Sequence, residues 1–252
     1  MNGLRILNTR PLPQGKQLSK SIADAGGVSI EFPAITLEPT ADSWLNDMPD
    51  LAKVSLAIFI SPNAVDYYFS RLKQQQIAWP QTLKVIAVGK ASAAALAALH
   101  VRVDYIPAIA DSEHLLELNV LQQIDKQRVL LIKGEGGRPL IGETLLARGA
   151  QLASLAVYRR VAPTIAQEYS NSLWHDDDVD IILFTSQQAM HNLFALFGDS
   201  ARAWLCSKPC IVISKRLAEE ASSLGITTVL ISRHDTLLSS LTHYNQGLIY
   251  DN

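Results

Sequence analysis

Short apolar runs in this sequence are repeatedly followed by residues that can hold an anion. The residues after each run are small, hydroxyl-bearing or cationic, and they stand where a helix would begin. Backbone N–H groups at a helix start favour carboxylate or phosphate. The candidate binding residues are Arg10, Ser61, Asn63, Gly89, Lys90, Ser92, Lys133, Gly134, Arg138, Thr185, Ser186, Ser214, Lys215 and Arg216.

Two pairs of these cations occupy matching positions in the two halves of the chain: Arg10 matches Lys133, and Lys90 matches Lys215. Ligands of an open α/β sheet bind beyond the carboxyl ends of its strands, so we expect the pairs to line both walls of one cleft. Positive charge on both walls favours a ligand with several negative charges. Taken singly, a serine or threonine here is more simply explained as a helix N-cap, and Lys90 and Lys215 as solvated side chains.

Other motifs argue against metal, nucleotide or serine-hydrolase chemistry. Residues 134–137 lack both the GK[ST] ending of a phosphate loop and the G-x-G-x-x-G spacing. The acidic run 175–178 is more typical of a solvated loop than of a metal site. Cys206 and Cys210 lack the further ligands that would complete a zinc site, and no nucleophile elbow is visible. We therefore predict no metal ligands.

The chain repeats itself, and the repeat places the candidate residues in equivalent positions. At an offset of 123, residues 5–40 overlay residues 128–163, and at an offset of 125, residues 56–116 overlay residues 181–241. Both offsets are close to half of the 252 residues. The order A–B–A′–B′ indicates an internal duplication. Matched pairs include Leu7 with Leu130, Gly26 with Gly149, Phe59 with Phe184, and Trp79 with Trp204.

Each half has the pattern of alternating strands and helices. The continuous apolar run 56–60, followed by turn residues, is typical of a parallel strand covered on both faces. Residues 14–25 have helical spacing through Leu18 and Ile22 and end at two glycines that suit a C-terminal cap. Alternating βα units predict open, doubly wound parallel sheets of the α/β class. Further strands are expected at 6–8, 28–32, 85–88, 103–106, 129–132, 181–184, 211–213 and 228–231, and further helices at 64–73 and 90–99.

The repeat leaves open which strands share a sheet. One arrangement joins A to B and A′ to B′, with a cut near residue 125. The other joins A to B′ and A′ to B. Segments 34–39 and 157–162 correspond under the offset of 123, and in the second arrangement both cross between domains. Two such crossings side by side would pair as a short hinge.

The composition is that of a globular protein, with 48% hydrophobic and 18% charged residues. The formal net charge of −2 gives no global basic field, so nucleic-acid binding is not predicted. No apolar run approaches the length of a membrane span. The first ten residues are expected to form a short strand rather than a signal sequence, and two cysteines are too few for a disulfide scaffold. A cytoplasmic protein with no membrane partner is the simplest expectation.

A series of short motifs, mostly beside predicted strand ends, occurs in a fixed order along the chain. They are Thr9-Arg10-Pro11, Phe-Ile-Ser-Pro-Asn-Ala-Val at 59–65, Val-Gly-Lys-Ala-Ser-Ala at 88–93, Lys-Gly-Glu-Gly-Gly-Arg at 133–138, Val-Tyr-Arg-Arg at 157–160, and Phe-Thr-Ser-Gln-Gln-Ala at 184–189, with Leu145 and Gly149 between them. Each motif is degenerate, but the ordered set resembles the uroporphyrinogen-III synthase family over nearly the whole chain.

The resemblance implies two flavodoxin-like, doubly wound domains joined by a two-stranded hinge. It places residues 1–33 and 164–252 in one domain and residues 41–156 in the other. Residues 34–40 and 157–163 would then be the interdomain linkers.

The resemblance also implies an activity. Hydroxymethylbilane, a linear tetrapyrrole with eight carboxylates, loses water and closes into uroporphyrinogen III with its last pyrrole ring inverted, a lyase reaction of haem biosynthesis. The family uses no metal or organic cofactor. Tyr158 matches the tyrosine of the family's second linker, which implies that it helps the hydroxyl group to leave. Ser92 keeps the hydroxyl of the family's G-x-x-T-A turn, whereas the equivalent position in the second repeat is Leu217. A monomer is expected.

The alternative function is a non-catalytic two-domain module that binds an anionic small molecule. A receiver module would need acidic residues at its strand ends, whereas these ends carry Arg, Lys, Ser and Thr. Catalytic turnover would distinguish the enzyme from the binding module.

Overall fold

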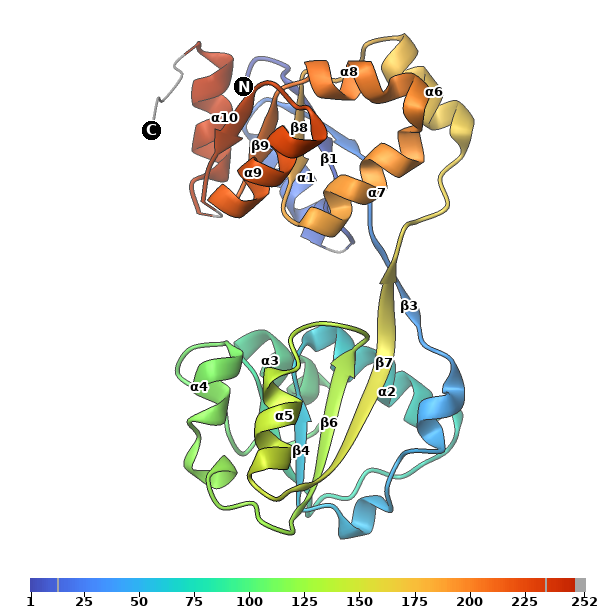
Figure 1. Cartoon of the computed structure of the whole chain (residues 1–252), viewed down its shortest axis with the longest axis vertical. Helices are drawn as coiled ribbons and strands as arrows, with labels where there is room; N and C mark the ends of the chain where they lie inside the picture. Colours follow the sequence, from blue (N-terminus) through green and yellow to red (C-terminus); the bar gives the residue numbers. More distant parts are fainter. Residues whose placement is uncertain (13, 234, 248–252) are drawn as a thin grey trace. The chain divides into compact units, whose positions relative to one another are not determined.

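The computed structural model describes residues 1–12, 14–233 and 235–247, and the chain divides into two compact units. Unit 1 comprises Met1–Thr36 and Val161–Asn252, and unit 2 comprises Leu37–Arg160. Each unit contains one five-stranded sheet with helices packed against it (Figure 1). In the described part of the chain, no helix is both long enough and apolar enough to cross a membrane.

The sheet of unit 1 has the strand order β10-β9-β8-β1-β2, and its neighbouring strands pair in parallel. Its strands are β1 (Arg5–Asn8), β2 (Val28–Glu31), β8 (Ile181–Phe184), β9 (Cys210–Val212) and β10 (Val229–Ile231). Its helices are α1 (Gln14–Asp24), α6 (Gln167–His175), α7 (Gln187–Phe197), α8 (Arg202–Ser207), α9 (Lys215–Leu224) and α10 (Leu237–Asn245), with a 3₁₀ turn at Asp199–Ala201.

Helices cover both faces of this sheet because its central strands are apolar on both sides. Successive side chains of a strand point to opposite faces. Along β8, Ile182 and Phe184 pack in one cluster with residues of α6, α7 and α8, while Ile181 and Leu183 pack in another with residues of α1 and α10. The continuous apolar run therefore produces a sheet buried on both faces.

The sheet of unit 2 has the strand order β3-β7-β6-β4-β5, and β7, β6, β4 and β5 pair in parallel. Its strands are β3 (Thr36–Pro39), β4 (Leu56–Phe59), β5 (Lys84–Ala87), β6 (Arg128–Gly134) and β7 (Gln151–Val161). Its helices are α2 (Pro62–Gln74), α3 (Lys90–Ala98), α4 (Ser112–Leu116) and α5 (Leu140–Ala147), with 3₁₀ turns at Asp42–Leu45, Leu51–Lys53 and Asn119–Leu121.

Unit 2 repeats the layering of unit 1. Ala57 and Phe59 of β4 pack in a cluster with residues of α2 and α3. Leu56 and Ile58 pack in the opposite cluster with residues of α4 and α5. The prediction of an α/β fold with parallel, doubly covered sheets is confirmed.

The segments that join the units meet at the edge of the unit 2 sheet, where β3 lies beside β7. The Thr40 N–H donates to the Val157 carbonyl at 3.3 Å. Arg159 forms an ion pair with Glu38, with 3.3 Å between Nη2 and Oε2. As residue numbers rise along β3 they fall along β7, so these two strands run in opposite directions.

Strands β2 and β3 of the first repeat correspond to the single strand β7 of the second. Pro33 lies between β2 and β3, and Ala156 occupies the matching position inside β7. Proline has no N–H to donate and restricts the residue before it, so it ends a strand that alanine continues.

One predicted strand is wrong. Residues 103–106 form only an isolated parallel bridge between Ile86 and Tyr105. Pro107 follows directly and cannot donate to a longer ladder, and Ile106 is exposed rather than buried.

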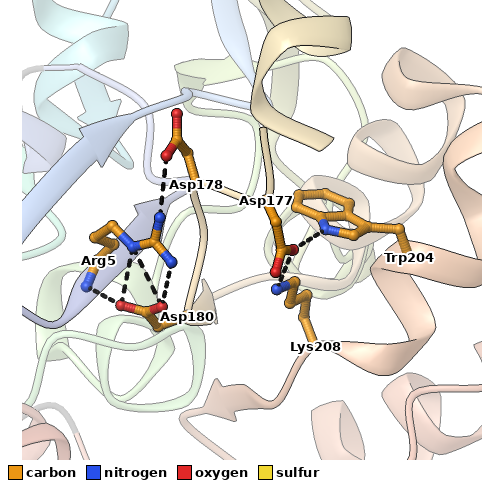
Figure 2. Close-up of polar contacts among 6 residues, drawn as sticks. All are labelled: Arg5, Asp177, Asp178, Asp180, Trp204 and Lys208. Carbon is orange, nitrogen blue, oxygen red and sulfur yellow. Dashed lines mark hydrogen bonds and ion pairs between the residues drawn. The ribbon is translucent and has the colours of Figure 1, made fainter. Parts of the chain in front are cut away.

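The acidic run 175–178 lies at the amino-terminal edge of the unit 1 sheet, where it forms ion pairs (Figure 2). Asp178 accepts from Arg5 Nη1 at 3.0 Å, and Asp180 accepts from Arg5 Nη2 at 2.6 Å. Asp177 Oδ1 lies 2.5 Å from Lys208 Nζ and accepts from Trp204 Nε1 at 2.6 Å. These contacts tie the loop before β8 to β1 and to the α8 region, and cations of the chain itself pair with Asp177, Asp178 and Asp180.

Candidate active site

The predicted binding residues of unit 1 gather at one edge of its sheet. β1, β8 and β9 are parallel neighbours, with Asn8 beside Leu183 and Phe184 beside Val212, so their carboxyl ends coincide. The candidate residues that follow these three strand ends are Arg10, Thr185, Ser186, Ser214, Lys215 and Arg216.

Arg10 is held where β1 ends. Its N–H donates to Asn8 Oδ1 at 3.2 Å, and Thr9 Oγ1 donates to the Leu183 carbonyl at 2.6 Å, which ties this end to β8. A Cβ on Gly15 would lie 2.7 Å from the Arg10 carbonyl oxygen, so only glycine admits this close approach. Burial lowers the pKa of the Arg10 guanidinium, which stays charged at neutral pH because arginine does not deprotonate in proteins.

Two candidate serines of unit 1 cap helices. Ser186 Oγ accepts from the Ala189 N–H at 3.1 Å, and Ser214 Oγ accepts from the Leu217 N–H at 3.4 Å. Both are half-buried, so each hydroxyl hydrogen remains available for a ligand while the oxygen serves the helix. Lys215 is exposed in the first turn of α9, as is Arg216 beside it.

The predicted binding residues of unit 2 also share one sheet edge. β4 lies between β5 and β6, and Phe59 is beside both Ala87 and Ile132. The residues that follow these three strand ends are Ser61, Asn63, Gly89, Lys90, Ser92, Lys133, Gly134 and Arg138.

The three candidate residues after β5 differ in how far they are exposed to solvent. Ser92 is 1% exposed, and Gly89 is buried where an added Cβ would lie 2.7 Å from the Ala110 Cβ. Lys90, between them, is exposed. Lys90 is therefore the member of this group whose side chain reaches solvent, while Gly89 and Ser92 pack within the unit.

A cavity of about 400 Å³ opens beside the end of β6. Lys133 and Arg138 line it together with the backbone of the glycine-rich turn and apolar side chains that include Ile60 and Leu131. Arg138 Nη2 lies 2.6 Å from Glu113 Oε1, and this contact lowers the pKa of the Glu113 carboxyl. Glu143 also lines the cavity, so its charged lining is mixed, and the two cations beside apolar side chains suit an apolar ring that carries carboxylate arms.

Tyr158 is buried, with 2% of its surface exposed, and its hydroxyl lies 3.1 Å from Ser61 Oγ. Its ring stacks on Tyr67 with centroids 5.5 Å apart, and the Arg160 guanidinium lies 5.7 Å from the ring centre. A Cβ on Gly134 would lie 2.6 Å from Tyr158 Cζ, so the ring rests against bare backbone.

A bulge in β7 explains this position. Lys133 pairs with Ala156, but Gly134 pairs with Tyr158, so Val157 is an extra residue in the ladder. Val157 and Tyr158 consequently pack in the same hydrophobic cluster, which regular alternation along a strand would prevent.

Sequence reasoning missed Tyr67, which lies on α2 and donates its hydroxyl to the Leu37 carbonyl at 2.8 Å. The pair Tyr67-Tyr68 looks like part of an amphipathic helix, and Tyr68 is indeed buried in the core. No local signal distinguishes the ring that supports Tyr158 from the ring that fills the core.

Solved structures share this two-sheet fold. Uroporphyrinogen-III synthetase from Helicobacter pylori 26695 matches with a TM-score of 0.61 at 16% identity, covering 97% of this chain and 99% of that one. A mutant uroporphyrinogen III synthase from the extremely thermophilic bacterium Thermus thermophilus matches with a TM-score of 0.60 at 17% identity, covering 98% and 99%. The fold thus defines a class of α/β proteins built from two mainly parallel sheets, and these synthases share it.

The sequence comparisons specify the family. The family model described as uroporphyrinogen-III synthase HemD matches residues 16–241. Uroporphyrinogen-III synthase of Escherichia coli (strain K12) is 32% identical over 245 residues, covering 94% of this chain and 100% of the relative. The synthase of Salmonella typhimurium (strain LT2) is also 32% identical, over 249 residues, with the same coverage. The chain belongs to the uroporphyrinogen-III synthase family, as its ordered motifs predicted.

Proposed function

We propose that this protein converts hydroxymethylbilane into uroporphyrinogen III, with loss of water and inversion of the terminal pyrrole ring. The observation that carries the proposal is the family match over residues 16–241, together with relatives aligned over their full length. The substrate is a small linear tetrapyrrole, and we expect the chain to act on it as a monomer.

The strand-end residues suit the carboxylates of such a substrate. In unit 2, Lys133 and Arg138 line the cavity beside β6. In unit 1, Arg10, Lys215 and Arg216 follow the ends of β1 and β9. We assign these cations, with the hydroxyl and backbone N–H groups beside them, to binding the acidic arms of the tetrapyrrole.

The chemical task is mainly geometric. The linear substrate can close spontaneously without inversion, so the protein must hold the last ring to attack through its substituted carbon and pass through a spiro intermediate. Each 1.36 kcal/mol of preference changes the product ratio about tenfold, so a few kcal/mol of positioning is enough to select the inverted product.

Departure of the substrate hydroxyl is the step that a proton donor accelerates. We assign this step to the neighbourhood of Tyr158, whose hydroxyl lies 3.1 Å from Ser61 Oγ at the start of α2. A hydroxyl that donates to the leaving oxygen allows it to depart as water.

The test is to supply hydroxymethylbilane and measure the ratio of type III to type I uroporphyrinogen. We expect the type III isomer to dominate with the protein and the type I isomer to dominate in buffer alone. Binding of the substrate without any rise in the type III product would contradict the proposal and favour the non-catalytic binding module.

A further inference from the structure

We propose that Ser61 and Tyr158 form a two-hydroxyl relay in which Ser61 donates a proton to the leaving hydroxyl of the substrate and Tyr158 replaces that proton. The inference rests on the proposed function. It assigns contact with the reacting atoms to Ser61, and it makes Tyr158 a positioning residue that acts through Ser61.

Burial distinguishes the two hydroxyl-bearing residues. Tyr158 is 2% exposed, and its ring is enclosed by Tyr67, Arg160 and the backbone of Gly134. Ser61 is half-buried and stands at the carboxyl edge of the sheet, where β4 passes into α2. Of the pair, Ser61 is the residue that a ligand at this edge can touch.

The contacts of Ser61 Oγ allow its own proton to point at a third partner. Ser61 Oγ accepts from the Ala64 N–H at 3.0 Å and lies 3.1 Å from Tyr158 Oη. A hydroxyl has two acceptor positions and one donor. Either hydroxyl can donate in the Ser61–Tyr158 contact, and the relay uses the arrangement in which Tyr158 donates. With the Ala64 N–H donating as well, the acceptor positions of Ser61 are then filled and its single O–H is left for a third partner.

The relay also supplies acidity that serine lacks, because a phenol is a stronger acid than an aliphatic alcohol. The C–O bond of the hydroxymethyl group breaks, and the oxygen keeps the electron pair and takes the Ser61 proton to leave as water. The pyrrole nitrogen donates its electrons to form an azafulvenium, Ser61 takes the Tyr158 proton, and Tyr158 becomes a phenolate. The proton that the terminal ring loses from carbon on final closure returns to Tyr158 through Ser61, so the step balances.

The position of the pair supports the transient negative charge. Ser61 is the N-cap of α2, a helix of 13 residues, so the amino-terminal end of its dipole lies beside the two oxygens. The Arg160 guanidinium over the Tyr158 ring adds a positive charge. Both favour a proton moving from Tyr158 toward Ser61.

The test is a double-mutant cycle on the rate of uroporphyrinogen III formation, with the variants S61A, Y158F and S61A/Y158F. Each single variant should lower kcat by about tenfold or more, as loss of general-acid assistance does, with KM changed less than about twofold. The double variant should be no slower than either single one, because the relay fails as a unit. S61T, which keeps the hydroxyl, should restore kcat to within about threefold of wild type.

Capping is separated from proton donation by S61N, since asparagine caps helices as well as serine does but carries no hydroxyl. S61N should be as slow as S61A, and recovery of activity in S61N would overturn the relay. The relay would also be overturned if Y158F had a much lower kcat than S61A and the double variant had the same kcat as Y158F. That result would make Tyr158 the direct donor. Losses that multiply in the double variant would overturn the relay too. A wild-type protein that forms no type III product would instead refute the proposed function itself.

Discussion

Gly134 lies so close to the ring of Tyr158 that there is no room for a side chain at this position. An alanine Cβ at this position would lie 2.6 Å from Tyr158 Cζ and 2.9 Å from its hydroxyl oxygen, both backed by the stacked ring of Tyr67. Overpacking of this kind costs about 1–3 kcal/mol. We expect Gly134→Ala to lower the free energy of unfolding by that amount, measured by urea denaturation, and to lower kcat because Tyr158 is displaced from Ser61.

A second glycine of the same unit provides the control. A Cβ on Gly142 would make only an ordinary contact, at 3.7 Å from Leu152, and Gly142 lies within α5. Gly142→Ala should leave stability unchanged or raise it by up to about 1 kcal/mol. Equal destabilisation by both substitutions would show that steric clearance for Tyr158 is not the reason for glycine at position 134.

Charge at the strand ends can be tested at Lys133, which lines the cavity of unit 2, and at its counterpart Arg10. If they bind carboxylates, reversing either charge should raise the KM for hydroxymethylbilane about three- to tenfold at low salt. The effect should shrink as ionic strength approaches 1 M, where charges are screened within about 3 Å. A loss of activity that is independent of salt and accompanied by a lower melting temperature would indicate misfolding instead.

At the level of single residues, the sequence predicted which side chains follow neighbouring strand ends but not what each of them does. Ser186 and Ser214 follow strand ends as predicted, and both cap helices. Ser92 has the same chemistry but is 1% exposed. A hydroxyl at the start of a helix can cap the helix or bind a ligand, and the local sequence is the same in both cases. Only the burial of the hydroxyl and its hydrogen-bond partners in the folded protein distinguish the two roles.

Among the elements, the loop before β8 depends on its ion pairs to β1. Asp180 accepts from both the backbone and the guanidinium of Arg5, and these hydrogen bonds hold the pKa of the Asp180 carboxyl below its usual range. A carboxyl with a lowered folded-state pKa stabilises the fold above its ordinary titration range. That stabilisation is lost as the pH falls through the lowered value.

We therefore expect Asp180→Asn to lower the free energy of unfolding at pH 7 by about 1 kcal/mol, a small value because the pair is about a third exposed. The difference from wild type should shrink below about pH 4, as Asp180 takes up its proton in the wild type. Urea denaturation at several pH values measures both effects. Asp176→Asn, in the neighbouring acidic run 175–178 but with no ion pair to described residues, should match wild type throughout. A constant difference at all pH values would refute the ion-pair account.

Element positions followed from the sequence wherever an apolar run lay between turn residues. β4 and β8 lie where they were predicted because their continuous apolar runs are buried on both faces. The strand expected at 103–106 failed because Pro107 stops the ladder after one bridge. No strand was predicted at 151–156, and only the following segment 157–162 was expected, as a crossing between domains. β7 runs through these residues because Ala156 stands where the first repeat has Pro33.

For the whole molecule, the repeat left two sheet arrangements open, and only the resemblance to the synthase family favoured the one that joins A to B′ and A′ to B. The apolar pattern of β1 is the same whether its neighbour is β4 or β8, because hydrophobicity dictates burial and not the identity of the partner strand. The structure pairs β1 with β2 and β8, and it pairs β6 with β7 and β4. The sheet of unit 1 therefore combines β1 and β2 of segment A with β8 of segment B′, and the sheet of unit 2 combines β4 of segment B with β6 and β7 of segment A′.

This topology predicts which fragment folds alone. Unit 2 is the continuous segment Leu37–Arg160, about half of the chain, and two hydrophobic clusters draw their members entirely from it. A segment that contains a complete sheet and the helices on both its faces has what a domain needs to fold. The excised fragment 37–160 should give an α/β circular dichroism spectrum and a cooperative urea transition worth at least about 3 kcal/mol, since marginal stability of a few kcal/mol is usual for domains of this size.

The matched control is the fragment 1–125, which a cut between A–B and A′–B′ would produce. It separates β1 and β2 from β8, and it separates β4 and β5 from β6, so each sheet loses its central pairing and exposes apolar strand faces. We expect this fragment to melt without a cooperative transition and to show no protected amides in hydrogen exchange. The opposite result, with 1–125 folding cooperatively and 37–160 not, would contradict this prediction. It would show that each sequence repeat folds as a unit and that the long-range pairing of β1 with β8 is dispensable for folding.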